Sequence, residues 1–87
     1  MNAVYKVKVV GAAKRQLKRL SKENQRRVLD KIEKLSLNPK PHGYKQLQVE
    51  ESLFRVRVGD YRVIYEIRDE VLIVLVLKVA HRREVYR

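Results

Sequence analysis

The sequence predicts an α+β fold: a small, twisted, antiparallel-type sheet with two N-terminal helices packed on one face, in the order β-α-α-β-β-β, and a short C-terminal tail or helix. Three observations predict it. Apolar residues alternate with polar ones near the N-terminus, recur at helical spacing between residues 12 and 37, and alternate again from residue 53 onward. The chain has 87 residues and contains no linker or low-complexity tract, so one domain is expected over residues 1–87.

The first element is a predicted strand over residues 4–10. Tyr5, Val7 and Val9 alternate there with lysines, which is the period of a half-buried strand. Gly11 follows and marks its end.

Two helices are predicted next, over residues 12–20 and 22–37, because apolar residues recur every three or four positions. Ser21 is the predicted N-cap of the second helix. Pro39 cannot continue a helix and therefore marks its end. The helical positions expected to face the core are Ala13, Leu17, Leu20, Val28, Leu29, Ile32 and Leu35.

Three further strands are predicted over residues 53–58, 61–68 and 71–79, with turns at Gly59-Asp60 and Asp69-Glu70. The last of them is apolar on both faces, which is typical of a strand inside the sheet. The sheet face expected under the helices is formed by Phe54, Val56, Tyr61, Val63 and Tyr65.

The hairpin at Gly59-Asp60 is the most informative feature for function. A two-residue loop predicts four cross-strand pairs, namely Val58 with Tyr61, Arg57 with Arg62, Val56 with Val63 and Arg55 with Ile64. Arg55, Arg57 and Arg62 then share one face of the sheet. Like charges directly across an antiparallel pair destabilise it, so this face is expected to bind a polyanion.

The same counting places the C-terminal tail beside these arginines. A two-residue turn at Asp69-Glu70 pairs Arg62 with Leu77, which puts Leu77, Val79 and His81 on the arginine face.

The composition favours nucleic acid as that polyanion. Twenty-one Lys and Arg against ten Asp and Glu give a net charge of +11, more than solubility requires in a small domain. No apolar run approaches the length of a membrane span, and the N-terminus lacks the apolar core of a signal peptide, so a cytoplasmic protein is expected. There is no cysteine, and neither His42 nor His81 lies in an acidic cluster, so neither a metal nor another cofactor is expected.

Metal-free RNA cleavage needs a base for the 2′-hydroxyl, cations for the phosphorane and an acid for the departing 5′-oxygen. Arginine forks suit the cationic role, because their planar donors meet two phosphate oxygens at once. The base is either Tyr86, with a pKa lowered by cations, or His81. Either Arg82 or His81 faces the leaving group.

Four motifs, in this order and spacing, resemble the RelE/ParE superfamily of toxins from toxin-antitoxin pairs, and within it the RelE branch. They are AKRQLKRL at 13–20, Leu-Asn-Pro at 37–39, RVRVGDYRVIY at 55–65 and HRREVY at 81–86. The resemblance implies a ribosome-dependent, metal-independent endoribonuclease that cleaves mRNA in the A site and inhibits translation. It also implies a cognate antitoxin, with operator DNA bound only through the toxin-antitoxin complex.

The resemblance also implies residue roles. Arg62 matches the phosphate-stabilising arginine of the family, Arg82 its C-terminal catalytic arginine and Tyr86 the tyrosine thought to act as base. His81 stands where some members have lysine. The expected catalytic set is Tyr86, Arg82, Arg62 and His81, and the expected phosphate-binding set is Arg55, Arg57, Arg83 and Lys45.

The helices carry a second basic surface, made of Arg15, Lys18, Arg19, Lys22, Arg26 and Arg27. Charge runs usually mark a solvated helix surface. On this chain they are expected to contact ribosomal RNA through sequence-independent phosphate contacts.

Two other functions are considered. One is a non-enzymatic inhibitor of DNA gyrase, as in the ParE branch of the superfamily. The other is a non-catalytic RNA-binding module, for which the net charge alone suffices. Neither accounts for the arginine face together with Arg82 and Tyr86.

Overall fold

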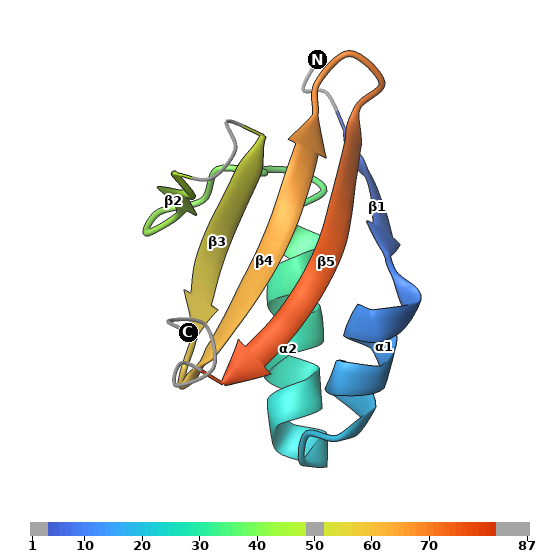
Figure 1. The fold of residues 1–87 in the computed structure, drawn as a ribbon, viewed down its shortest axis with the longest axis vertical. Coiled ribbons are helices and arrows are strands. Elements are labelled where there is room, and N and C mark those ends of the chain that lie inside the picture. Colours follow the sequence, from blue (N-terminus) through green and yellow to red (C-terminus); the bar gives the residue numbers. More distant parts are fainter. Residues whose placement is uncertain (1–3, 49–51, 82–87) are drawn as a thin grey trace.

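The computed structural model describes residues 4–48 and 52–81, which form a sheet with both helices on one side of it (Figure 1). The elements are β1 (Lys6–Val9), α1 (Gly11–Lys18), α2 (Lys22–Lys34), β2 (Lys45–Gln46), β3 (Leu53–Val58), β4 (Tyr61–Arg68) and β5 (Ile73–His81). The α+β fold and the position of the helices are confirmed, and β2 is a short strand that was not predicted.

The sheet has five strands in the order β1-β5-β4-β3-β2. β1 runs parallel to β5, and the other neighbouring strands are antiparallel. β5 therefore lies inside the sheet, as its apolar sequence predicted. We call the side that carries the helices the helix face and the other side the open face; Figure 1 is viewed from the open face.

The helices pack through their predicted apolar positions. Ala13 and Leu17 of α1 and Val28 and Ile32 of α2 are buried against the sheet. The Ser21 hydroxyl caps α2 by accepting a hydrogen bond from the Asn24 backbone N–H at 3.2 Å, as predicted.

Two details of α2 differ from the prediction. The helix ends at Lys34, three residues before the predicted end at Leu37, since the chain turns there ahead of Pro39. Leu29 was expected in the core, but it points outward and is 42% exposed.

Tyr65 is the largest fully buried side chain at the centre of the core. Its hydroxyl donates to the Pro39 carbonyl oxygen at 2.7 Å, which ties the loop after α2 to the sheet. Phe54 stacks on Tyr65 with a centroid distance of 6.1 Å, and Tyr44 packs on Phe54 at 5.9 Å. Burial raises the pKa of the Tyr65 phenol well above its ordinary value.

The turn between β4 and β5 is longer than predicted. Arg68 pairs with Ile73, so residues 69–72 form the turn, and Leu72 adopts a left-handed φ of 53°. The predicted strand start at Val71 is therefore wrong. Hydrophobicity alone does not separate Val71 and Leu72 from the strand that follows.

A register shift in β5 changes which side chains share a face. Tyr65 pairs with Val76, but Ile64 pairs with Lys78, so the shift inserts one extra residue into β5, as in a β-bulge. Arg62 consequently lies opposite Ala80 and not opposite Leu77.

The placement of Val79 and His81 on the arginine face was therefore wrong. Val79 pairs with Val63 and His81 with Tyr61, and both partners belong to the helix face. The His81 ring packs edge-on against Tyr61, with a centroid distance of 5.5 Å.

β1 accompanies β5 only as far as Val76. Beyond that residue α1 takes over the edge of β5, where the Gln16 side-chain oxygen accepts a hydrogen bond from the Val79 backbone N–H at 2.7 Å. This contact satisfies a backbone donor that no strand can reach.

Candidate functional site

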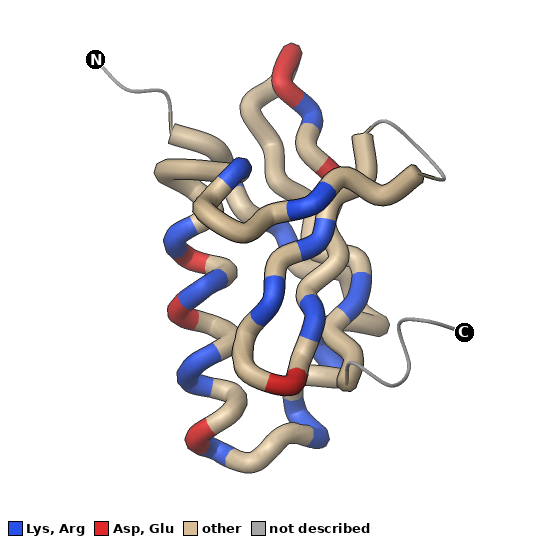
Figure 2. Tube along the Cα trace, turned by 90° about the vertical axis from the view of Figure 1, so that its left-hand side faces the viewer, with Lys and Arg blue, Asp and Glu red and all other residues tan. Residues whose placement is uncertain are grey.

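The hairpin of β3 and β4 has the predicted register. All four predicted pairs are present, including Arg57 opposite Arg62 and Arg55 opposite Ile64. Arg55, Arg57 and Arg62 therefore share the open face, and Lys45 of β2 joins them opposite Arg55. Figure 2 shows the Lys and Arg positions of these strands close together along the hairpin.

The turn at the hairpin tip fixes the direction of one of these arginines. Gly59 has a φ of +59° and Asp60 does not share a positive φ, which is the pattern of a type II′ turn. The Arg57 Nε donates to the Gly59 carbonyl oxygen at 3.2 Å. Arg57 is thus partly pre-oriented by the turn that precedes Arg62.

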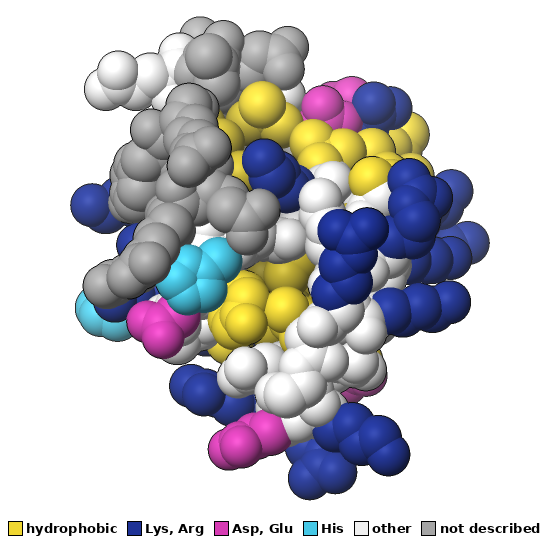
Figure 3. All heavy atoms as spheres, turned by 60° about the horizontal axis from the view of Figure 1, so that its bottom comes forward, with side chains coloured by type: hydrophobic (Ala, Val, Ile, Leu, Met, Phe, Trp, Pro, Cys, Tyr) yellow, Lys and Arg dark blue, Asp and Glu magenta, His cyan; other side chains and the backbone are white. Residues whose placement is uncertain are grey.

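Arg27, from α2, also reaches this tip. Its guanidinium lies so close to Gly59 that a Cβ added there would be 3.1 Å from an Arg27 terminal nitrogen. Figure 3 looks at this end of the molecule and shows Lys and Arg side chains along one side of a central hydrophobic patch. Arg27, one of the residues predicted to contact ribosomal RNA, therefore lies next to the arginine hairpin.

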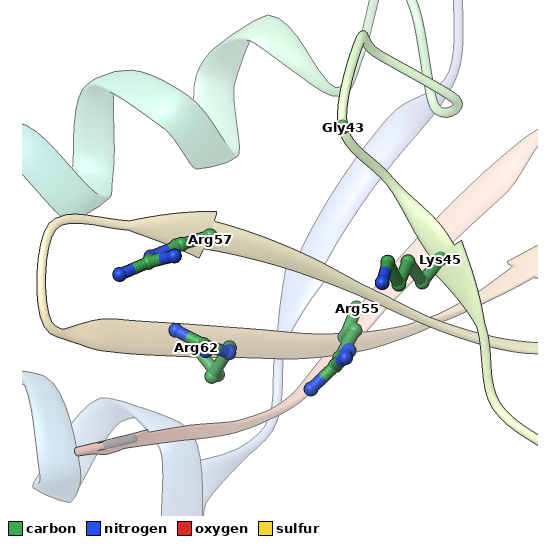
Figure 4. Close-up of a pocket in the computed structure, with 5 residues that line it drawn as sticks. All are labelled: Gly43, Lys45, Arg55, Arg57 and Arg62. Carbon is green, nitrogen blue, oxygen red and sulfur yellow. The ribbon is translucent and has the colours of Figure 1, made fainter.

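The arginines line a pocket of about 340 Å³ on the open face, together with Gly43 and Lys45 (Figure 4). Three of its side chains come from the hairpin strands, one from β2, and Gly43 lies on the loop before β2. The pocket is lined by cationic side chains and a glycine backbone, so a phosphate is the chemical group that it fits.

Arg62 is the buried member of this set. It is 7% exposed, whereas Arg57 is exposed and Arg55 half-buried. Arginine keeps its charge in folded proteins, and a charge in a poorly solvated position attracts an anion more strongly than one in water. Arg62 is consequently the residue around which a bound phosphate would be held.

The basic positions predicted on the helices, Arg15, Lys18, Arg19, Lys22, Arg26 and Arg27, are all exposed. α2 also carries acidic residues on its surface, and one ion pair joins Lys34 to Asp30 at 3.0 Å. The helix surface is therefore of mixed charge, unlike the hairpin, and contact with ribosomal RNA stays a prediction.

Arg82, Arg83 and Tyr86 lie outside the described residues, so their predicted roles stay predictions. His81 is described, and its position on the helix face separates it from the arginine pocket. This position argues against a role for His81 at a phosphate held by Arg62.

Sequence reasoning missed three basic residues of the open face. Lys6 and Lys8 lie opposite Ile73 and Leu75, and Lys78 lies opposite Ile64. The alternating lysines of the first strand were a visible signal, but the neighbour of that strand was not predictable. Lys78 reaches this face only because of the register shift.

Within residues 4–48 and 52–81, no group of three or more His, Cys, Asp or Glu side chains is placed to hold a metal ion. In the same described part of the chain, neither helix is long and apolar enough to cross a membrane.

Comparison with known proteins places the fold in one family. The family model of the ParE toxin of type II toxin-antitoxin systems, parDE, matches residues 7–86. No curated protein sequence matches the chain significantly.

Solved structures agree with the family match. A chain of the archaeal RelE-RelB complex from Pyrococcus horikoshii superposes with a TM-score of 0.82 at 31% identity, over 91% of this chain and 96% of that one. A chain of a RelBE toxin-antitoxin complex from Mycobacterium tuberculosis gives 0.80 at 33% identity, over 91% and 99%. The isolated RelE toxin of E. coli shares the fold, with a TM-score of 0.78 at 22% identity, over 94% and 90%.

Proposed function

The chain belongs to the ParE toxin family of type II toxin-antitoxin systems, within the RelE/ParE superfamily, and from this premise we propose that it is a ribosome-dependent, metal-independent endoribonuclease. In this proposal it works in the cytoplasm, cleaves mRNA in the A site and so inhibits translation. The observation that carries the proposal is the pocket of Lys45, Arg55, Arg57 and Arg62, with Arg62 buried on a rigid hairpin.

The proposed chemistry starts with attack of a ribose 2′-oxygen on the adjacent phosphorus. Negative charge then builds on the phosphorane oxygens, and cations that are already in place stabilise this charge without reorganising. Arg62 stabilises the phosphorane most directly, because it is the least solvated cation of the pocket. Arg55 and Arg57 hold the remaining phosphate oxygens.

We assign to Tyr86 the removal of the 2′-hydroxyl proton and to Arg82 the contact with the departing 5′-oxygen. The bond from phosphorus to that oxygen breaks, the oxygen takes a proton from water, and a 2′,3′-cyclic phosphate remains. Tyr86 and Arg82 both follow β5 closely in sequence. Ala80, on β5, lies directly opposite Arg62, and Arg82 comes two residues after it. This short distance along the chain supports the roles proposed for Arg82 and Tyr86, and we propose Arg83 as a further phosphate ligand.

A cognate antitoxin is the proposed protein partner. The chains similar to this one from Pyrococcus horikoshii and Mycobacterium tuberculosis are each found in a complex with an antitoxin. We propose that this chain is neutralised in the same way, and that operator DNA is bound only through the toxin-antitoxin complex.

A single-turnover assay tests the proposed function. Ribosomes carrying an mRNA with an empty A site are mixed with wild type, Arg62→Lys or Arg62→Gln. Removing one preorganised charge-stabilising group lowers a rate by about 10²–10³-fold, which is the loss expected for Arg62→Gln. Arg62→Lys retains the charge without the fork, so an intermediate rate is expected.

The control in that assay is Lys31→Gln, a half-buried position on α2 away from the sheet surface. Its rate should equal that of wild type. Equal rates for Arg62→Gln and wild type would exclude the pocket from the chemistry.

Inhibition of DNA gyrase is the second candidate, because the matching family model is that of the ParE toxin. A gyrase inhibitor acts through a protein surface and does not need a phosphate pocket. If the protein inhibits gyrase, Arg62→Gln should still arrest growth and inhibit supercoiling. If it is a ribonuclease, Arg62→Gln should no longer arrest growth, and neither wild type nor the variant should affect supercoiling. A plain RNA-binding module would bind mRNA without producing new ends.

A further inference from the structure

The basic surface of the open face continues past the arginine pocket to the opposite side of the sheet. We propose that Lys78, Lys8 and Lys6 extend the pocket into a track for single-stranded RNA, which binds the nucleotides flanking the cleaved phosphate. This inference rests on the proposed function and names where the substrate runs.

Lys78 joins the pocket to the rest of the track. It lies opposite Ile64, which in turn lies opposite Arg55, and Arg55 lies opposite Lys45. Partners in neighbouring strands share a face, so this row carries Lys45, Arg55 and Lys78 across four strands. The register shift near Ile64 is what brings Lys78 to this face, and such shifts often re-aim a side chain near functional sites.

β1 adds two further lysines on the far side. Lys8 lies opposite Leu75, whose partner Glu66 lies four residues after Arg62 on β4 and shares its face. Lys6 lies two residues before Lys8 and so shares its face. Both lysines are exposed.

The charge of the face suits a polyanion. The acidic side chain on the described part of these strands is Glu66, and it is already paired with the Arg68 Nε at 2.5 Å. The other charged side chains on this face are Lys or Arg, separated by half-buried apolar residues such as Ile64 and Leu75. Within the described strands, this face therefore carries an excess of Lys and Arg over one acidic side chain that is already paired.

The length of the face fits several nucleotides. Four steps between neighbouring strands, from β2 to β1, span about 19 Å. A stacked nucleic-acid strand rises about 3.4 Å per nucleotide, so this length corresponds to about five nucleotides, or fewer if the strand is extended.

Single-stranded RNA is favoured over an acidic protein segment. A polypeptide that adds to a sheet pairs with a strand edge through its backbone, whereas the proposed track runs across the face of the sheet, where side chains and not backbone groups point outward. The lysines are also continuous with the pocket that is proposed to hold the cleaved phosphate.

The test is RNA binding by full-length variants carrying Tyr86→Phe, so that the RNA is not cut. One variant adds Lys6→Ala, Lys8→Ala and Lys78→Ala; its charge-matched control adds Lys14→Ala, Lys31→Ala and Lys34→Ala on the helices. The probes are labelled oligouridylates of about 12 and about 3 nucleotides, chosen to exceed or to fall short of the track. Circular dichroism confirms that each variant folds.

The track predicts at least a tenfold weaker affinity of the sheet variant for the longer RNA, with little change for the shorter one. The slope of log affinity against log salt should fall by about 2, because each lost contact with single-stranded RNA contributes about 0.7. The control variant at Lys14, Lys31 and Lys34 should keep most of its affinity for the longer RNA and most of its salt slope.

Equal losses for the two triple variants, or an unchanged salt slope, would overturn the track. A larger loss of affinity for a polyglutamate peptide than for RNA would instead assign the face to an acidic protein segment, which also overturns it. The proposed function is judged separately by cleavage of ribosome-bound mRNA with Tyr86 intact. If wild type cleaves mRNA but the variant at Lys6, Lys8 and Lys78 binds the longer RNA normally, only the track is wrong. If wild type does not cleave mRNA, the proposed function is wrong, and the binding data still decide whether the track exists.

Discussion

Among single residues, Arg62 is the one on which the proposed function depends most. It lies opposite Arg57 on a paired strand and is 7% exposed, a position where a guanidinium repels its neighbour and loses water. In the proposed function, this poorly solvated charge is the one that stabilises the phosphorane.

Tyr65 carries the clearest prediction at this scale. Its buried phenol donates to Pro39, and burial raises its pKa above the ordinary value of about 10. The unfolded chain therefore loses this proton at a lower pH than the folded protein. The contribution of Tyr65 is fully present below about pH 10 and is lost as the pH rises from there toward the higher folded-state pKa.

Tyr65→Phe should therefore lower the free energy of unfolding by about 1 kcal/mol at neutral pH, because the hydrogen bond to Pro39 is lost. It should also weaken the fall in stability above about pH 10. Urea unfolding at several pH values measures both effects, with Tyr44→Phe as the control at an exposed tyrosine. Parallel pH profiles for wild type and Tyr65→Phe would contradict the assignment.

At the scale of elements, the hairpin of β3 and β4 was predictable and the strand after it was not. A two-residue turn leaves one register, so counting from Gly59 and Asp60 gave the four predicted pairs correctly. The next turn has four residues and β5 contains an extra residue, and neither follows from hydrophobic alternation. His81 was misplaced for this reason.

The candidate site divides in the same way. The shared face of Arg55, Arg57 and Arg62 could be predicted because it depends only on the local register of one hairpin. The position of Lys6 and Lys8 could not be predicted, because it depends on the long-range pairing of β1 with β5. That pairing depends in turn on how the helices carry the chain across the sheet. Local turn chemistry can be inferred from sequence, whereas contacts between distant strands depend on the packing of the whole core.

The hairpin turn itself can be tested with Gly59. Its φ of +59° strains any residue with a Cβ, and an added Cβ would meet Arg27 at 3.1 Å. Gly59→Ala should lower the free energy of unfolding by about 1–2 kcal/mol. Gly59→Asn should lose less, because asparagine tolerates this conformation better.

The control for this prediction is Gly43→Ala, where φ is +88° and a Cβ would meet nothing within 4 Å. At this position the substitution tests backbone strain alone, because the added Cβ makes no contact. If Ala and Asn at position 59 were equally destabilising, strain at the turn would not be the cause.

In the whole molecule, the Lys and Arg residues of the described part lie mainly on two surfaces. One is the open face of the sheet, where they line the pocket, and the other is the helices, where α2 also carries acidic residues. Figure 2 shows both arrangements, with alternating signs along α2 and Lys and Arg positions along the hairpin.

This arrangement predicts an unusual response to salt. Raising NaCl from about 50 mM to about 500 mM shortens the Debye length and screens repulsion on the open face, so the melting temperature of wild type should rise. Arg57→Gln with Arg62→Gln should reduce that rise more than Lys14→Gln with Lys31→Gln, which removes the same charge from the helices. An equal reduction in both variants would show that the repulsion is spread over the whole molecule.

Mapping mRNA 5′ ends in a translating extract, with and without the protein, tests whether the protein is a ribosome-dependent endoribonuclease. Wild type should produce new ends within codons at the ribosomal A site, and Arg62→Gln and Tyr86→Phe should not, although both fold and bind antitoxin. Translation that continues at the full rate with no new ends would contradict the account and favour inhibition of gyrase.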